Sequence, residues 1–156
     1  MLDTCSKEER WNAVEEIIER WLQSRQALIV EFCAVSGVHQ YTPNTQRSKL
    51  RLQKFCQLLV DYVSAGHFEI YYELIREAEV FQDGSEKLGK ALLPLIDEST
   101  EISLNFNDTY ATADCDKVIP GLSETLSQLG ETMVSRFDIE DQLIDAMHNA
   151  HAEQVA

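Results

Sequence analysis

The chain has 156 residues, an apolar fraction of 44% and a formal net charge of −14. This length and composition suit one folded domain with a full hydrophobic core and argue against a disordered chain. Residues 91–156 carry 13 acidic and two basic side chains, whereas residues 1–90 carry 14 and 11. Direct nucleic-acid binding is disfavoured, because phosphate contacts need clustered Lys and Arg. An acidic chain is attracted to basic protein surfaces instead, although its charge can also serve solubility alone.

The sequence indicates a soluble, cytoplasmic protein with residues 1–156 in a single domain. No apolar run approaches the roughly 20 residues that span a bilayer, and the acidic N-terminus does not resemble a signal peptide. Four widely separated cysteines form no CxxC pair, so we expect reduced and mostly buried thiols.

The first helix is predicted to start at a capping box, Ser6-Lys7-Glu8-Glu9. Apolar residues at helical spacing continue to Val35, and Gly37 is well placed to end the helix. Residues 37–46 are predicted to form a loop. A second helix should begin near residues 45–48 and run to about Ser64, and its first half carries a basic cluster: Arg47, Lys49, Arg51 and Lys54.

A tight corner at Ser64-Ala65-Gly66 is predicted to separate this helix from a third one, which ends near Phe81. Gly66 would let the chain turn, and four residues around the corner are predicted to build the core: Phe55, Leu59, Val63 and Phe68. After Asp83-Gly84-Ser85, a fourth helix should run towards Tyr110 with a kink at Pro94.

Residues 111–121 are predicted to form a linker or a short helical turn before the last helix. That helix is apolar on one side, and the last few residues after it are expected to fray. Its other side is acidic: Glu124, Glu131, Asp138, Asp141 and Asp145. Because the chain lacks β-like alternation, we expect an all-α fold, an elongated antiparallel helical bundle with a four-helix core.

Metal binding by such a bundle is one alternative that the sequence leaves open. The Glu-x-x-His motif of di-iron carboxylate bundles is missing, and the nearest match is Asp145-Ala-Met-His148, followed by His151. Both histidines lie where the helix is expected to fray, so we predict no metal and no cofactor.

Histidine phosphotransfer through His67 is a related alternative. Glu69 places a repulsive charge near any phosphoryl group there, and a structural histidine is the plainer interpretation. The chain contains no Gly-rich phosphate loop, GxSxG elbow or HExxH motif, and Cys33 and Cys56 have no base nearby in sequence. We therefore expect a protein that is not an enzyme.

Protein binding fits the remaining features. Asp61 stands among apolar and aromatic residues, where a partner Arg or Lys could meet it with water excluded. Aromatic residues of the types enriched at binding hot spots lie nearby, although several of them are expected to pack in the core. These residues are Trp21, Tyr62, Phe68, Tyr71 and Tyr72.

The segment Leu50–Tyr71, LRLQKFCQLLVDYVSAGHFEIY, resembles the Rsd/AlgQ family of bacterial anti-sigma regulators. Four further segments resemble the same family in the same order: residues 9–11, 19–22, 34–38 and 136–141. The details Met1-Leu2 and Tyr41-Thr42-Pro43 are more similar to the AlgQ branch than to the enteric Rsd branch.

This resemblance implies a helical bundle that binds region 4 of the primary sigma factor, a basic module that reads the −35 promoter element and contacts core RNA polymerase. Covering region 4 would block both contacts, without DNA or membrane binding by this chain. AlgQ-type members are also linked to alginate control. The family's sigma-contacting acid maps onto Asp61. By neighbourhood, the other expected sigma-binding residues are Tyr62, Ser64, His67, Tyr71 and Trp21. The oligomeric state is left open.

Overall fold

The computed structural model describes residues 6–36, 46–111 and 115–155, with the side chains of 46–48 and 115–120 excepted, and every regular element in these ranges is helical. The elements are α1 (Lys7–Ser36), α2 (Gln46–Ala65), the π-helix η3 (Gly66–Ile70), α3 (Tyr71–Phe81), α4 (Ser85–Leu92), α5 (Pro94–Tyr110), α6 (Cys115–Met147), the 3₁₀-helix η4 (Asn149–His151) and α7 (Ala152–Val155).

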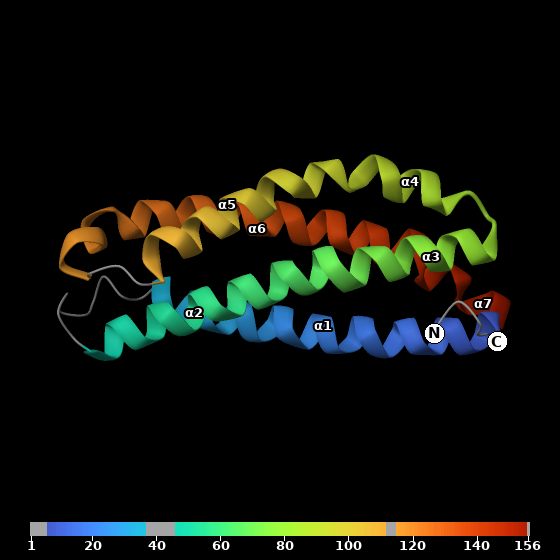
Figure 1. Ribbon diagram of the computed structural model, residues 1–156, viewed down its shortest axis with the longest axis horizontal. Helices are drawn as coiled ribbons and strands as arrows, with labels where there is room; N and C mark the ends of the chain where they lie inside the picture. Colours follow the sequence, from blue (N-terminus) through green and yellow to red (C-terminus); the bar gives the residue numbers. More distant parts are fainter. Residues whose placement is uncertain (1–5, 37–45, 112–114, 156) are drawn as a thin grey trace.

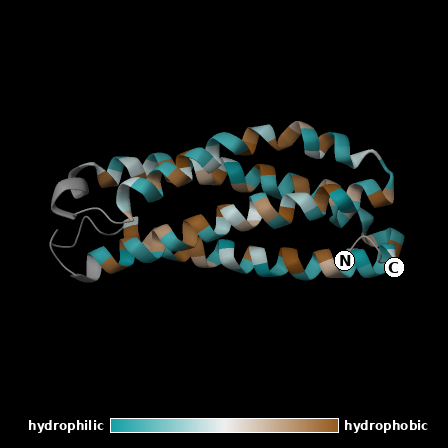
Figure 2. Ribbon diagram, viewed as in Figure 1, coloured by the Kyte–Doolittle hydropathy of each residue, from teal (hydrophilic) through white to brown (hydrophobic). Residues whose placement is uncertain are grey.

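These elements form four long rods that lie side by side in an elongated bundle (Figure 1). The rods are α1, the run α2–η3–α3, the pair α4–α5, and α6, and successive rods run in opposite directions. Brown and teal residues alternate along each rod, as expected of amphipathic helices (Figure 2). The predicted all-α antiparallel bundle with a four-helix core is confirmed. None of the described helices has the length and apolarity required to cross a membrane.

The predicted start of the first helix is confirmed. The backbone N–H of Glu9 donates to Ser6 Oγ (3.2 Å), and the N–H of Ser6 donates to Glu9 Oε2 (3.4 Å). The predicted cap at Gly37 lies outside the described residues, as does the predicted loop up to residue 45. The next helix begins at Gln46, within the expected range.

The predicted corner at residues 64–66 is wrong, because the chain stays helical from α2 through η3 into α3. Ala65 and Tyr71, which flank the π-helix, both have right-handed helical dihedral angles. Gly66 is required because a side chain does not fit at this position, and not because the chain turns there. A Cβ at this position would lie 2.9 Å from Tyr71 Oη and 3.2 Å from Trp21 Cζ2, so a side chain would collide with both rings. The chain reverses only after Phe81, where Gln82 (φ 54°) and Gly84 (φ 84°) are left-handed.

Where a kink was expected at Pro94, the fourth predicted helix is divided in two, since α4 ends at Leu92 and the proline opens α5. The expected linker at 111–121 is wrong for most of its length, because α6 already starts at Cys115. Pro120 and Gly121 both lie within the helix, and the fixed φ of proline is itself helical.

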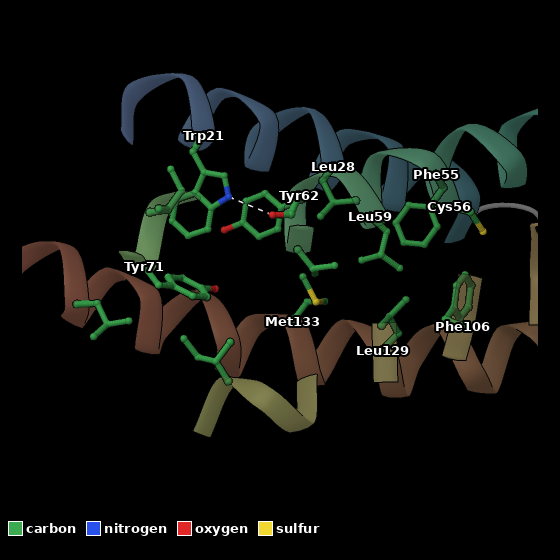
Figure 3. Close-up of a cluster of buried hydrophobic side chains, with 14 of the residues drawn as sticks. Trp21, Leu28, Phe55, Cys56, Leu59, Tyr62, Tyr71, Phe106, Leu129 and Met133 are labelled. Carbon is green, nitrogen blue, oxygen red and sulfur yellow. Dashed lines mark hydrogen bonds between the residues drawn. The ribbon is translucent and has the colours of Figure 1, made fainter. Parts of the chain in front are cut away.

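The core fills the space between the four rods (Figure 3). Phe55, Leu59 and Val63 are buried in it, as predicted. Phe68 was expected there too, but its side chain is 79% exposed. The reason is the position of Phe68 around the helix. Because there is no corner, Phe68 lies about half a helical turn after Gly66, which faces inward, so Phe68 faces outward.

Candidate functional site

An exposed stripe runs along one face of the continuous α2–η3–α3 rod. It consists of Asp61, Ser64, Phe68 and Tyr72, spaced three or four residues apart, and is called the Asp61 stripe below. Asp61 is exposed and accepts a hydrogen bond from Gln57 Nε2 (2.9 Å). Phe68 and Tyr72 are 79% and 57% exposed, which is unusual for large aromatic side chains. The stripe thus joins an exposed carboxylate to a pair of accessible aromatic rings.

His67 widens the stripe at its centre. Its ring is exposed and contacts the Phe68 ring edge-to-face, with 4.8 Å between the ring centroids. Ser64 is half-buried between Asp61 and Phe68. A π-helix carries this part of the stripe, and such segments occur frequently at functional sites.

Beneath the stripe lies a buried polar cluster, called the Glu140 network below: Arg25, Tyr62, Tyr71, Arg136 and Glu140. The Tyr62 hydroxyl donates to Glu140 Oε1 (2.5 Å) and the Tyr71 hydroxyl donates to Oε2 (2.6 Å). Each hydroxyl also accepts a hydrogen bond, from Arg25 Nε (2.9 Å) and Arg136 Nη2 (2.8 Å) respectively. The two tyrosines bracket the π-helix in sequence, so the α6 carboxylate fixes both ends of η3.

The charges of this network are paired inside the bundle. Arg136 donates from Nε to Glu140 (3.1 Å), and its Nη1 donates to the hydroxyls of Ser99 (3.1 Å) and Thr100 (2.6 Å). Arg25 donates to Glu140 (3.3 Å) and to the exposed Asp141 (2.6 Å). Because buried charges need partners of opposite sign, these contacts explain how Arg136 and Glu140 are tolerated in the core.

Both tyrosine hydroxyls are held in the neutral form. Burial raises the pKa of Tyr62 and of Tyr71, and the negative charge of Glu140 raises each pKa further. Each phenol therefore remains a proton donor to the carboxylate, which is what the hydrogen-bond geometry requires.

Trp21 packs directly against the same tyrosines. Its ring stacks on Tyr62, with 4.9 Å between centroids, and meets Tyr71 edge-on. Its indole N–H donates to the Tyr62 carbonyl oxygen (3.2 Å), shown as a dashed line in Figure 3. This carbonyl belongs to the last turn of α2, so Trp21 ties α1 to the rod just before the π-helix.

The structure therefore divides the six residues expected to bind the partner. Asp61, Ser64 and His67 are accessible on one face. Trp21, Tyr62 and Tyr71 are buried, and their surfaces are already used in the core. The aromatic side chains that are exposed on this face are those of Phe68 and Tyr72.

Sequence reasoning missed the roles of Arg25, Arg136 and Glu140. Their partners lie up to 116 residues away along the chain, so no local pattern brings them together. One signal could have pointed to them: Arg136 and Glu140 are four residues apart on the apolar side of the last helix, where charges are costly unless paired.

The two C-terminal histidines are ordered and buried, which corrects the expectation of a frayed end. They belong to a histidine cluster made of Glu15, Glu77, Asp83, His148 and His151. His148 Nδ1 lies 2.7 Å from Glu77 Oε1, and its Nε2 lies 2.5 Å from Glu15 Oε2. His151 bridges Glu77 (2.9 Å) and Asp83 (2.6 Å). The cluster ties the end of α6 and η4 to α1, α3 and the turn after α3.

Aromatic rings shield this cluster: Trp11 stacks on His148, and Phe81 stacks on His151. Burial alone would lower the pKa of His148, but its hydrogen bonds to Glu77 and Glu15 and their negative charges outweigh burial and raise the pKa. His148 is thus a buried structural bridge that a phosphate donor cannot reach. Within the described part of the chain, no group of three or more His, Cys, Asp or Glu side chains could hold a metal ion.

The outward face of α6 is acidic, as predicted. All five expected carboxylates are exposed: Glu124, Glu131, Asp138, Asp141 and Asp145. Of the two cysteines with described side chains, Cys56 is buried and Cys33 is exposed, so the expectation of buried thiols holds for one of them.

Comparison with known proteins gives the family. The profile described as "Regulator of RNA polymerase sigma(70) subunit, Rsd/AlgQ" matches residues 1–148. A protein named "Regulator of sigma D" from Yersinia pseudotuberculosis serotype O:1b is 34% identical over 151 residues, which cover 95% of this chain and 89% of that protein.

Two proteins with the same name are also similar. The one from Yersinia enterocolitica is 33% identical over 138 residues, covering 87% of this chain and 83% of that protein. The one from Salmonella paratyphi B is 32% identical over 148 residues, covering 90% of each chain. The profile matches nearly the whole length of the sequence, and this chain therefore belongs to the Rsd/AlgQ family, the non-enzymatic regulators of the RNA polymerase sigma(70) subunit.

Proposed function

We propose that this protein binds region 4 of the primary sigma factor through the Asp61 stripe and His67. The observation that supports this most is the pairing of an exposed carboxylate with two exposed aromatic rings on one rigid helical face. Aromatic residues dominate binding hot spots, and a carboxylate contributes more to the affinity when a partner Arg meets it in a desolvated interface. A basic helix-turn-helix surface offers the matching chemistry.

The Glu140 network supports this surface from below without touching the partner. Trp21, Tyr62 and Tyr71 hold α2, η3 and α3 in one register, so Asp61 and Phe68 are positioned before binding. A preorganised surface loses less entropy on binding than a flexible one. In this arrangement the buried aromatic residues act as positioning residues, and the exposed ones make the contacts.

Occupation of region 4 by a protein of charge −14 would exclude both the −35 DNA and the core polymerase surface that binds region 4. The consequence is reduced transcription from housekeeping promoters and more polymerase for alternative sigma factors. This activity places the protein in the cytoplasm, where RNA polymerase works.

Calorimetric titration with an isolated region 4 fragment tests the proposal. Asp61→Ala should weaken the complex by about 2–5 kcal/mol if the charge pair is desolvated. Phe68→Ala should weaken it by about 2 kcal/mol or more, the level expected of a hot spot. Asp97→Ala, which removes an exposed carboxylate from α5, is the matched control and should bind normally.

Circular dichroism checks that all three variants remain folded, and added salt should weaken the wild-type complex. No complex at tens of micromolar, or an Asp61→Ala variant that binds like wild type, would refute the proposed surface.

A closer relation to the AlgQ branch, with control of alginate as a downstream effect, is a finer proposal. It depends on Met1-Leu2 and Tyr41-Thr42-Pro43, which lie outside the described residues. Restoration of alginate production in a strain lacking AlgQ would support it, and failure of a well-expressed chain that still binds region 4 would count against it.

A further inference from the structure

A cavity opens between α1 and α6, towards the C-terminal end of α1. Its inner part has a volume of about 170 Å³ and is lined by nine residues from α1, α2 and α6. All nine are apolar or glycine; Ile29, Phe32, Leu59, Gly130 and Met133 are among them. No polar side chain in this lining could hold ordered water, so the inner part favours an apolar occupant.

A wider groove of about 650 Å³ lies beside the inner part, nearer the surface. Phe32, Gly130 and Val134 line both spaces. The groove adds a polar rim of four serines and the exposed Glu131, and neither lining contains a Lys, Arg or His. The chemistry therefore changes from fully apolar inside to hydroxyl groups and a carboxylate outside.

Gly130 lines both spaces. A Cβ at this position would lie 2.8 Å from Phe32 Cζ, so any residue other than glycine would require the Phe32 ring to move. By contrast, a Cβ at Gly121 of the same helix would meet nothing within 4 Å. A side chain at position 130 would therefore displace a neighbouring side chain, whereas one at position 121 would not.

We propose that this cavity binds a small amphiphile with a phenyl or short alkyl end and a neutral or positively charged head. Size supports the apolar end, since a cavity of about 150 Å³ lined by Leu, Ile and Phe is large enough to hold benzene. Charge supports the head, because Glu131 and the acidic face of α6 attract a cation and repel an anion. The site is separate from the Asp61 stripe and does not depend on the proposed sigma binding.

Phenethylamine and 3-phenylpropionate are suitable probes, because they share a phenylethyl end and carry opposite charges. Methyl NMR of methionine-labelled protein reports on the site, because Met133 lines the cavity and Met147 packs near Gly89 elsewhere. Phenethylamine should shift the Met133 methyl signal saturably and leave Met147 unchanged. Its affinity should be at least about tenfold higher than that of 3-phenylpropionate.

Two variants should each weaken phenethylamine binding by about tenfold or more, a change of 1.4 kcal/mol. Ile29→Phe fills the inner part, and Gly130→Ala drives the Phe32 ring from its place; Gly121→Ala is the matched control and should bind like wild type. If one variant fails to fold, the other decides. No saturable Met133 shift, equal binding of the anion, or wild-type binding by a folded Ile29→Phe or Gly130→Ala variant would overturn the proposal.

Discussion

Replacing Glu140 by Gln should destabilise the bundle strongly, although the two side chains have nearly the same shape. Glu140 accepts four hydrogen bonds, at 2.5, 2.6, 3.1 and 3.3 Å, and is fully buried. In Gln, one acceptor oxygen becomes an NH₂ group, which faces either the donors of Tyr62 and Arg25 or those of Tyr71 and Arg136. Removing one partner of a buried ion pair costs about 3–5 kcal/mol, and Gln retains part of the hydrogen bonding.

We therefore expect Glu140→Gln to lower the free energy of unfolding by about 2–4 kcal/mol. This is a large share of the roughly 5–15 kcal/mol that stabilises a domain, and it corresponds to a fall in Tm of about 5–15 °C for a chain of this size. Urea unfolding followed by circular dichroism measures the loss.

Asp138→Asn is the matched control, since it makes the same chemical change on an exposed position of the same helix. Its effect should stay within about 0.5 kcal/mol. A loss below about 1 kcal/mol for Glu140→Gln, or one no larger than that of the control, would mean that Glu140 does not hold the network as a charged acceptor.

Two other predictions concern His148, just after the end of α6, and Gly66, in the middle of the α2–η3–α3 rod. Because the pKa of His148 is raised in the folded state, protonated His148 adds stability that is fully present below its unfolded pKa of about 6.5 and is lost as pH rises through its folded pKa. Unfolding free energies measured from pH 6 to pH 9 should fall with pH, and His148→Gln should flatten that fall; an unchanged slope in the variant would contradict the assignment. Gly66→Ala should cost about 1–3 kcal/mol, because the new methyl group collides with Tyr71, whereas Gly121→Ala meets nothing and should be neutral or stabilising. Equal stabilities of these two alanine variants in urea would show that Gly66 is not required by packing.

The sequence alone determined that the fold is helical, where the first helix begins, and that Pro94 interrupts the third rod. These features depend on neighbours within one or two turns, such as the Ser6–Glu9 capping box, so local reasoning is sufficient. The sequence also singled out Asp61 as a candidate, because a charge among apolar neighbours is visible without a fold, and its side chain is exposed in the structure.

Only the tertiary structure decided what happens around Gly66. Locally, Ser-Ala-Gly is compatible with a turn, but Trp21 from α1 and Tyr71 close over the glycine and the helix continues. That continuity turns Phe68 outward and sets the composition of the proposed binding face. The tertiary structure also decided the surroundings of His148, whose partner Glu15 is 133 residues away along the chain. Partners so distant in sequence are chosen by the packing of whole helices, because a buried charge is stable only where the fold supplies its counter-charge.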